Sequence, residues 1–169
     1  MWKPVVGYED SYEVSDSGMV RSIDRIGYDG RKLKGMPLTP CLAGRGYLTV
    51  CLRKNGVTVR EYIHRLVAQA FVPRVDGCDT VNHKDGNKNN NSADNLEWTT
   101  YSQNNQHAYD TGLKERGSEF YNAKLTEDAV REIKRNGKYA TYQEIADKYG
   151  VTKATIRDVL VGNSWAYIA

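Results

Sequence analysis

The chain is poor in the features that hold the smallest folds together or carry a protein across a membrane. Its three cysteines, Cys41, Cys51 and Cys78, are odd in number and form no CxxC pair, so we expect neither a zinc ribbon nor a disulfide framework. No apolar run approaches the roughly 18 residues of a membrane span, and the chain does not open like a signal peptide. With 169 residues it can hold two or three small modules. We expect a cytoplasmic protein without a membrane partner.

The net charge of +3 is too small to identify a partner, but its distribution is uneven. Between Arg21 and Arg65 there are ten Lys or Arg residues against three acidic ones, a local balance of +7. Such a stretch can follow a phosphate backbone. An ordinary solvated surface also fits this balance.

The most informative segment is an Asn-rich loop between two short apolar runs. Asn and Gly crowd residues 86–91 and favour a turn, since both adopt left-handed backbone conformations at low cost. Val81 on one side, and Leu96 and Trp98 on the other, predict two strands that pair across the loop, followed by a helix over 102–109. His83 lies at the end of the first strand. With an ordinary pKa of roughly 6.5, it suits the task of taking a proton from water.

Asn82-His83, Asn95 twelve residues on, and Asn104 nine further resemble the motif of the HNH endonucleases, also called ββα-metal or His-Me finger nucleases. The resemblance is to the homing endonucleases of phages and introns in particular. It implies hydrolysis of a phosphodiester in double-stranded DNA at a specific site, with Mg²⁺ or Mn²⁺ as the cofactor.

The same resemblance implies a role for each motif residue. His83 would be the general base, Asn95 would fix the loop and orient that histidine, and Asn82 and Asn104 would bind the metal. Better-studied sites often carry Asp at the position of Asn82, and a neutral amide attracts a cation less strongly. His107, one turn beyond Asn104, is a rival metal ligand.

Other residues of the loop have simpler interpretations. Asp85 can support a ligand, but we favour a turn-forming role. Lys84 and Lys88 are expected to contact phosphates.

The first part of the chain, 1–46, alternates short β-type pairs with Gly, Asp and Ser turns. It looks like the NUMOD4-like module that often precedes the HNH motif in homing endonucleases. Arg21, Arg25 and Lys34 are its expected phosphate contacts.

The nuclease core is expected over 47–110. Alternating runs on either side of Asn55-Gly56 predict a β-hairpin. A helical apolar stripe from Ile63 to Phe71, ended by Pro73, predicts a core helix. His64 and Arg65 lie off this stripe, on the side where the cleft is expected. For His64 we favour a structural or supporting role over catalysis.

A polar linker is expected over 111–124, followed by a helical domain over 125–169. Thr126, the capping box Thr141–Glu144 and Thr152 predict three helix starts. The spacing of small and apolar residues around Gly150 resembles a helix-turn-helix, although a plain three-helix packing unit has the same pattern. In a helix-turn-helix, the recognition helix begins at Lys153, and we expect Lys153, Thr155 and Arg157 to contact DNA.

Together these patterns predict a modular α+β protein with a ββα-metal core, an N-terminal β-rich module and a C-terminal helix-turn-helix. The expected function is site-specific cleavage of double-stranded DNA by a monomer, most simply as a nick. The alternative is a non-catalytic DNA-binding regulator built on a decayed nuclease core.

Overall fold

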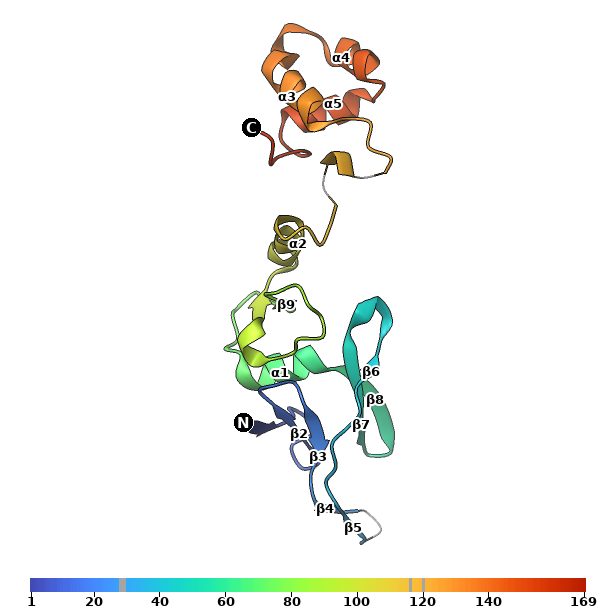
Figure 1. Cartoon of the computed structure of the whole chain (residues 1–169), viewed down its shortest axis with the longest axis vertical. Coiled ribbons are helices and arrows are strands. Elements are labelled where there is room, and N and C mark those ends of the chain that lie inside the picture. Colours follow the sequence, from blue (N-terminus) through green and yellow to red (C-terminus); the bar gives the residue numbers. More distant parts are fainter. Residues whose placement is uncertain (28–29, 116, 120) are drawn as a thin grey trace. The chain divides into compact units, whose positions relative to one another are not determined.

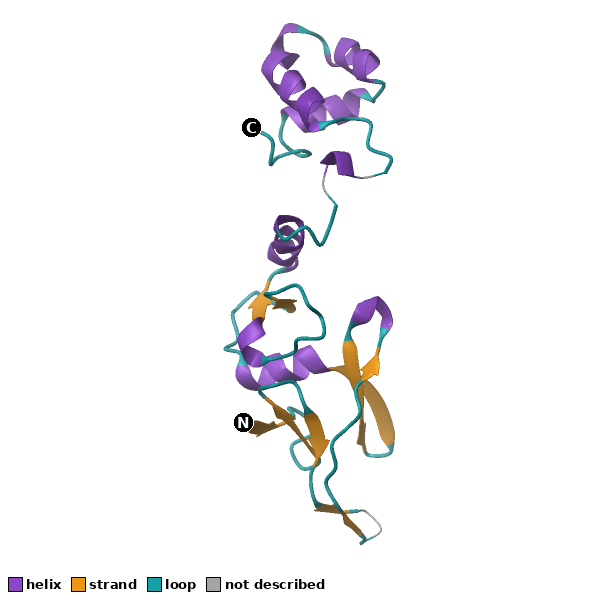
Figure 2. Ribbon diagram, in the orientation of Figure 1, coloured by secondary structure: helices purple, strands orange, loops and turns teal. Residues whose placement is uncertain are grey.

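The computed structural model describes residues 1–27, 30–115, 117–119 and 121–169, and its chain forms two compact units, 1–111 and 112–169 (Figure 1). The fold is α+β, as expected. The first unit contains small antiparallel sheets with helices, and the described part of the second is helical (Figure 2). The boundary between the units lies one residue beyond the expected one at 110. The expected modules 1–46 and 47–110 are parts of one unit.

The N-terminal segment forms a sheet of order β1-β2-β3, with β1 (Trp2–Pro4), β2 (Tyr12–Ser15) and β3 (Val20–Ser22). A second small sheet pairs β4 (Arg25–Ile26) with β5 (Lys32–Leu33). In β2, alternate side chains Tyr12 and Val14 are buried because successive residues of a strand point to opposite faces.

A three-stranded sheet follows, with β6 (Cys41–Leu42), β7 (Leu48–Lys54) and β8 (Val57–Tyr62) in that order, and a 3₁₀ turn η1 (Gly44–Gly46) between β6 and β7. The hairpin expected at Asn55-Gly56 is present. Both turn residues have positive φ, 52° and 80°, which is the backbone form that a two-residue hairpin turn requires.

Helix α1 (Ile63–Phe71) begins where β8 ends, and its apolar stripe is buried as expected. Its residues share one hydrophobic core with strands from both halves of the unit. This common core explains why no domain boundary falls near residue 46. The core contains Val5, Tyr12, Val14 and Val20 from the N-terminal segment, and Val50, Leu52, Ile63, Leu66, Val67, Leu96 and Trp98 from the rest.

The Asn-rich loop connects β9 (Thr80–His83) to β10 (Leu96–Thr99), with a 3₁₀ turn η2 (Ala93–Asn95) before β10. These strands pair antiparallel, with His83 opposite Leu96 and Asn82 opposite Glu97. Helix α2 (Tyr101–Asp110) follows, opened by a capping box between Thr100 and Gln103. The expected strand, strand and helix are therefore present in order.

The second unit contains η3 (Gly117–Glu119), α3 (Glu127–Asn136), η4 (Gly137–Tyr139), α4 (Tyr142–Tyr149) and α5 (Lys153–Leu160). Thr126, Thr141 and Thr152 cap the three α-helices through their side chains, as the sequence predicts. Gly150, at φ 63°, ends α4 in the left-handed form and starts the short turn to α5.

Part of the expected linker contacts the following helix. Ser118 Oγ donates to Glu127 Oε2 at 2.5 Å, so part of this segment is tied to α3. Arg116 and Phe120 of the expected linker lie outside the described residues.

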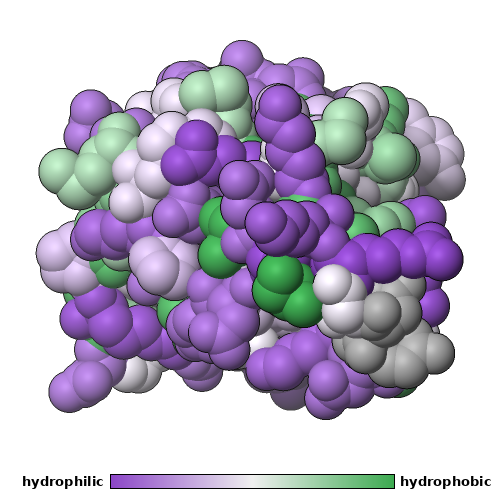
Figure 3. Space-filling view, turned by 90° about the horizontal axis from the view of Figure 1, so that it is seen from below, coloured by the Kyte–Doolittle hydropathy of each residue, from purple (hydrophilic) through white to green (hydrophobic). Residues whose placement is uncertain are grey.

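On the face shown in Figure 3, hydrophobic residues appear as scattered patches among hydrophilic ones. Within the described residues, no helix combines the length and the apolar character that a membrane crossing demands.

Candidate active site

His83 lies at the end of β9 in a buried aromatic setting, with 5% of its surface exposed. Its ring centroid is 5.3 Å from that of His64 and 6.1 Å from that of Tyr47. His83 Nε2 is 3.1 Å from Asn91 Oδ1. The strand, the start of α1 and the Asn-rich loop together fix the place of this imidazole.

The surroundings of His83 favour its neutral form. Burial lowers the pKa of His83 below its usual value and outweighs the hydrogen bond to Asn91 Oδ1 and the charge of Asp85, which raise it. The nearby Lys88 ammonium adds to the lowering of this pKa. A neutral imidazole at cellular pH is the form that can accept a proton.

His64, on α1, contacts His83 and is buried although it does not belong to the apolar stripe of the helix. It is buried between the rings of Tyr47, Tyr62 and His83, and its Nδ1 atom is buried without a hydrogen-bond partner. Burial, followed by the charge effects of His83 and Arg65, lowers the pKa of His64 to about 4. His64 therefore stays neutral beside His83.

The Asn-rich loop is held by a network centred on Asp85 and Asn95. Asn95 Nδ2 donates to Asp85 Oδ1 at 2.9 Å and to the carbonyl of Asn90 at 2.8 Å, while Asn95 Oδ1 accepts from the Asp85 amide at 3.2 Å. Hydrogen bonds from Asn90 and Asn95, and from the Asn87 backbone, lower the pKa of Asp85. Asn95 thus fastens the loop, while the amide that contacts the His83 ring belongs to Asn91.

Asn82 precedes His83 at the end of β9, directly opposite Glu97 of β10. Its Nδ2 donates to Glu97 Oε1 at 2.8 Å, which leaves Asn82 Oδ1 as the atom available to a ligand. Thr99, on the same face as Asn82, bonds Gln103 of α2 at 3.1 Å. Helix α2 therefore begins beside the face that carries Asn82 and Glu97.

The two helix residues expected near the metal occupy different settings. His107 Nε2 is 3.1 Å from the carbonyl oxygen of Lys84, a contact that joins α2 to the end of β9. Asn104 precedes His107 by three residues and so shares its helix face. The contact with Lys84 occupies one ring nitrogen of His107, which favours Asn104 as the ligand.

Asn82 and Glu97, which contact each other, and Asn104 on α2 all carry donor atoms that suit a hard divalent cation. The oxygens of Asn82, Asn104 and Glu97 are the type that Mg²⁺ and Mn²⁺ prefer. Among the described residues, no group of three or more His, Cys, Asp or Glu side chains is placed to hold a metal ion. Glu97 supplies a carboxylate next to Asn82, where the sequence alone offers an amide.

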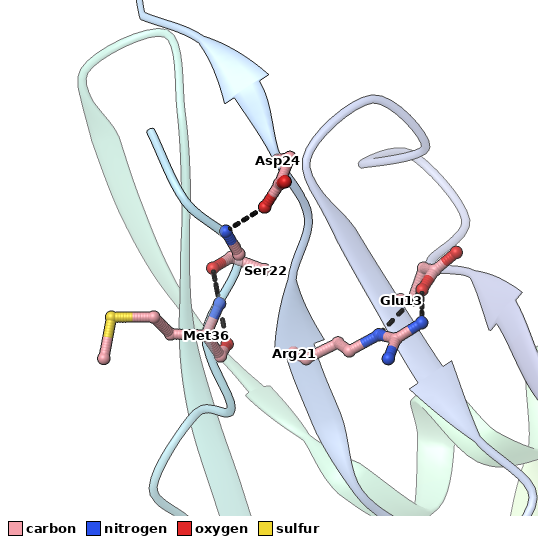
Figure 4. A network of polar contacts seen from close by, with 6 residues as sticks. Glu13, Arg21, Ser22, Asp24 and Met36 are labelled. Carbon is pink, nitrogen blue, oxygen red and sulfur yellow. Dashed lines mark hydrogen bonds and ion pairs between the residues drawn. The ribbon is translucent and has the colours of Figure 1, made fainter. Parts of the chain in front are cut away.

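The basic residues of the N-terminal segment differ in how free they are to contact phosphates. Arg21 donates to Glu13 at 2.7 Å, as Figure 4 shows, and its guanidinium lies 4.1 Å from the ring centroid of Trp2. Figure 4 also shows Asp24 and Ser22 holding the segment at Gly35 and Met36. Arg21 is thus engaged within the protein.

Arg25 donates to the carbonyl of Ile23 at 3.3 Å, whereas Lys34 is exposed. Lys34 is therefore more available to a phosphate than Arg21 or Arg25.

In the nuclease loop, Lys84 donates to the carbonyl of Asp94 at 2.9 Å. Lys88 donates to that of Arg45 at 2.8 Å, and its ammonium lies 4.9 Å from the ring centroid of Tyr47. Since Tyr47 also contacts His83, Lys88 brings a positive charge close to the histidine pair.

In α5, Lys153 and Arg157 are exposed, although Arg157 also pairs with Asp158 at 3.0 Å. Thr155 is partly buried, and its hydroxyl is 3.0 Å from that of Thr152 at the start of the helix. Of the three expected DNA contacts, Thr155 is the least available.

Three residues near the site were missed by sequence reasoning. Glu97 could have been found, because it alternates with buried Leu96 and Trp98 and so shares a face with Asn82. Tyr47 and Asn91 carry no such signal. Asn91 is one of several similar residues in the loop, and only the fold distinguishes it.

Comparison with known proteins gives two family matches: residues 1–53 match the NUMOD4 motif, and residues 61–106 match a family described as HNH endonuclease. The DNA endonuclease I-HmuI of Bacillus phage SP01 is 31% identical over 166 residues, which cover 96% of this chain and 90% of that protein. An HNH endonuclease of Acanthamoeba polyphaga mimivirus is 33% identical over 150 residues, and the match covers 89% of this chain but only 39% of the viral protein.

A solved structure is similar as well. It shows DNA binding and cleavage by the HNH homing endonuclease I-HmuI. The two structures match with a TM-score of 0.55 and 28% sequence identity, and the match covers 96% of this chain and 90% of that one. The two strands and the loop around His83 and the first part of α2 fall inside the HNH match, and the sheet of β1, β2 and β3 falls inside the NUMOD4 match. On these grounds the chain belongs to the HNH endonuclease family, of the homing-endonuclease type that begins with a NUMOD4 motif.

Proposed function

We propose that this protein is a site-specific endonuclease that hydrolyses a phosphodiester in double-stranded DNA. The observation that carries the proposal is the setting of His83. It is a buried imidazole with a lowered pKa, located where an Asn-rich loop meets a ββα unit. The DNA binding and cleavage named for I-HmuI support the substrate class.

His83 acts as the general base. It takes a proton from a water molecule, whose oxygen forms the new bond to phosphorus as the bond to the leaving alkoxide oxygen breaks. His64, neutral beside it, adds no positive charge that would oppose protonation of His83. Asn95 and Asp85 keep the loop in the form that encloses the base.

Asn82, Asn104 and Glu97 are proposed to hold Mg²⁺ or Mn²⁺. When bound, the cation supplies positive charge that stabilises the pentavalent phosphate of the transition state. The Asn82 amide is oriented by its hydrogen bond from Nδ2 to Glu97 Oε1, which leaves Oδ1 as the oxygen that would bind the cation. Lys88, close to Tyr47, is a further cation for a phosphate oxygen.

The second unit is proposed to bind DNA through α4 and α5. Two helices joined by a short turn with a left-handed glycine have the connection of a helix-turn-helix. Lys153 and Arg157 are exposed on α5, where a recognition helix would present its side chains. One histidine and one metal site form one cutting centre, so a monomer would nick one strand.

The competing candidate is a DNA-binding regulator without catalysis, favoured by the amide at Asn82 in place of a carboxylate. Incubation of the purified protein with supercoiled plasmid, with and without Mg²⁺, separates the two. The nuclease converts the plasmid to relaxed circles only when Mg²⁺ is present, whereas a regulator retards the plasmid and leaves it supercoiled.

The His83→Ala variant tests the role of the base. Removal of a general base commonly lowers a rate by about 10² to 10⁴. We expect this loss in single-turnover cleavage, with DNA affinity kept. Equal cleavage by the variant and the wild type would exclude His83 as the base.

A further inference from the structure

The contact between Asn91 and His83 determines which nitrogen of the imidazole carries the proton. Asn91 is 5% exposed, and its Nδ2 donates to the carbonyl of Asn89 at 3.3 Å. This bond orients the amide so that Oδ1 is the atom that meets His83 Nε2, at 3.1 Å. Because an amide oxygen can only accept a hydrogen bond, Nε2 must carry the ring proton. The lone pair that can take a proton from water is then on Nδ1.

Asn91 is itself in contact with the N-terminal segment. Gly18, in the turn between β2 and β3, approaches it so closely that a Cβ there would lie 3.0 Å from Asn91 Cβ and 3.2 Å from the Asn91 carbonyl oxygen. The amide of Ala93 donates to the carbonyl of Asp16 at 2.8 Å. The close approach of Gly18 and the hydrogen bond from Ala93 thus place the β2–β3 turn directly against Asn91.

The turn at residues 15–18 is well braced. Ser15 is 1% exposed, and its Oγ accepts from the Met19 amide at 2.9 Å. The Gly18 amide donates to the Ser15 carbonyl at 3.1 Å. Ser15 also ends β2, whose Val14 belongs to the common core of the unit. A movement of this turn would disturb the core, so the turn provides a fixed surface for Asn91.

We propose that the β2–β3 turn and Asn91 position the catalytic base, with the turn holding Asn91 and Asn91 holding His83 with its proton on Nε2. The proposal rests on the proposed role of His83 as the base. It assigns the N-terminal module a function in catalysis, besides any contact that the module makes with DNA. Asn91 is a positioning residue, since it acts on the imidazole and not on the substrate.

The first test replaces Asn91 in two ways. Asn91→Asp keeps an oxygen acceptor for His83 Nε2 while losing the Nδ2 donor to Asn89, whereas Asn91→Leu keeps the branched side chain and loses the acceptor. Proton NMR at neutral pH should show a slowly exchanging Hε2 signal of His83 in the wild type and in Asn91→Asp, and none in Asn91→Leu. The single-turnover cleavage rate should fall roughly a hundredfold in Asn91→Leu, as expected for a misplaced catalytic group, with unchanged DNA affinity.

The second test uses two glycines of the N-terminal segment. Gly18→Ala and Gly7→Ala share a strained backbone, at φ of 85° and 81°, but a Cβ at Gly7 meets nothing within 4 Å. Gly18→Ala should weaken the Hε2 signal and lower the cleavage rate about tenfold. Gly7→Ala should keep both at the wild-type level.

Two results would overturn the proposal: an intact Hε2 signal in Asn91→Leu, or the same signal and rate in Gly18→Ala as in Gly7→Ala. If Gly18→Ala does not fold, the comparison of Asn91→Asp with Asn91→Leu still tests the proposal. Loss of the signal in Asn91→Leu, combined with full cleavage by His83→Ala, would instead show that the contact exists and that His83 is not the base.

Discussion

Replacement of His64 by Phe should make the first unit less sensitive to acid. The pKa of His64 is lowered to about 4, against an ordinary value of roughly 6.5 in an unfolded chain. Between these values the unfolded chain binds more protons than the folded one, so the stability that neutral His64 contributes is lost as the pH falls from 6.5 towards 4. From pH 7 to pH 5 the two pKa values give a loss of about 2 kcal/mol.

His64→Phe keeps a ring against Tyr47 and removes the buried Nδ1 atom that lacks a partner. The variant should therefore fold at pH 7 with at least the stability of the wild type. Hydrogen exchange of the amides of Leu66 and Val67, corrected for intrinsic rates at each pH, reports the opening of this unit. The wild type should lose roughly thirtyfold more protection than the variant between pH 7 and pH 5, the factor that about 2 kcal/mol represents. Equal losses in both proteins would refute the assignment of a neutral, buried His64.

Other predictions concern catalysis and DNA binding. The single-turnover rate should be near its plateau at pH 7 and fall only below about pH 6.5, because the pKa of His83 is lowered; a rate that still climbs steeply above pH 7 contradicts this. Asn82→Asp should lower the Mg²⁺ concentration for half-maximal cleavage and Glu97→Gln should raise it, with parallel changes in Mn²⁺ affinity by calorimetry; two unchanged titrations would place the metal elsewhere. Lys88→Ala should weaken all DNA alike, whereas Arg157→Ala should reduce the preference for target over random DNA, and binding across a salt series on both DNAs separates these outcomes.

Local patterns predicted the elements of this fold well. Asn55-Gly56, the stripe of α1 and the three threonine caps each specify an element through short-range chemistry, and all are present. The contacts between elements were harder to predict. The shared core of residues 1–111 joins strands distant in sequence, so the alternation of turns in the first 46 residues suggested a separate module.

In the candidate site, too, the order of residues along the chain was easier to predict than the contacts between elements. The spacing from His83 to Asn95 and Asn104 indicated the motif, because the family resemblance places its residues in order along the chain. The partners of those residues come from elsewhere: Glu97 from the facing strand, and His64 from α1. Asn91 touches the His83 ring, while Asn95 ties the loop, a distinction that depends on which way each amide points.

The common core of the first unit has a consequence for protein engineering. A chimera that joins the first 46 residues of one homologue to the remainder of another would bring together Val14 and Val20 with a foreign Leu52 and Leu96, and the mismatch would fall inside a close-packed interior. A crossover between residues 111 and 112 leaves each core intact. Recombination, in the laboratory or in evolution, should therefore exchange the C-terminal unit far more readily than the first 46 residues alone.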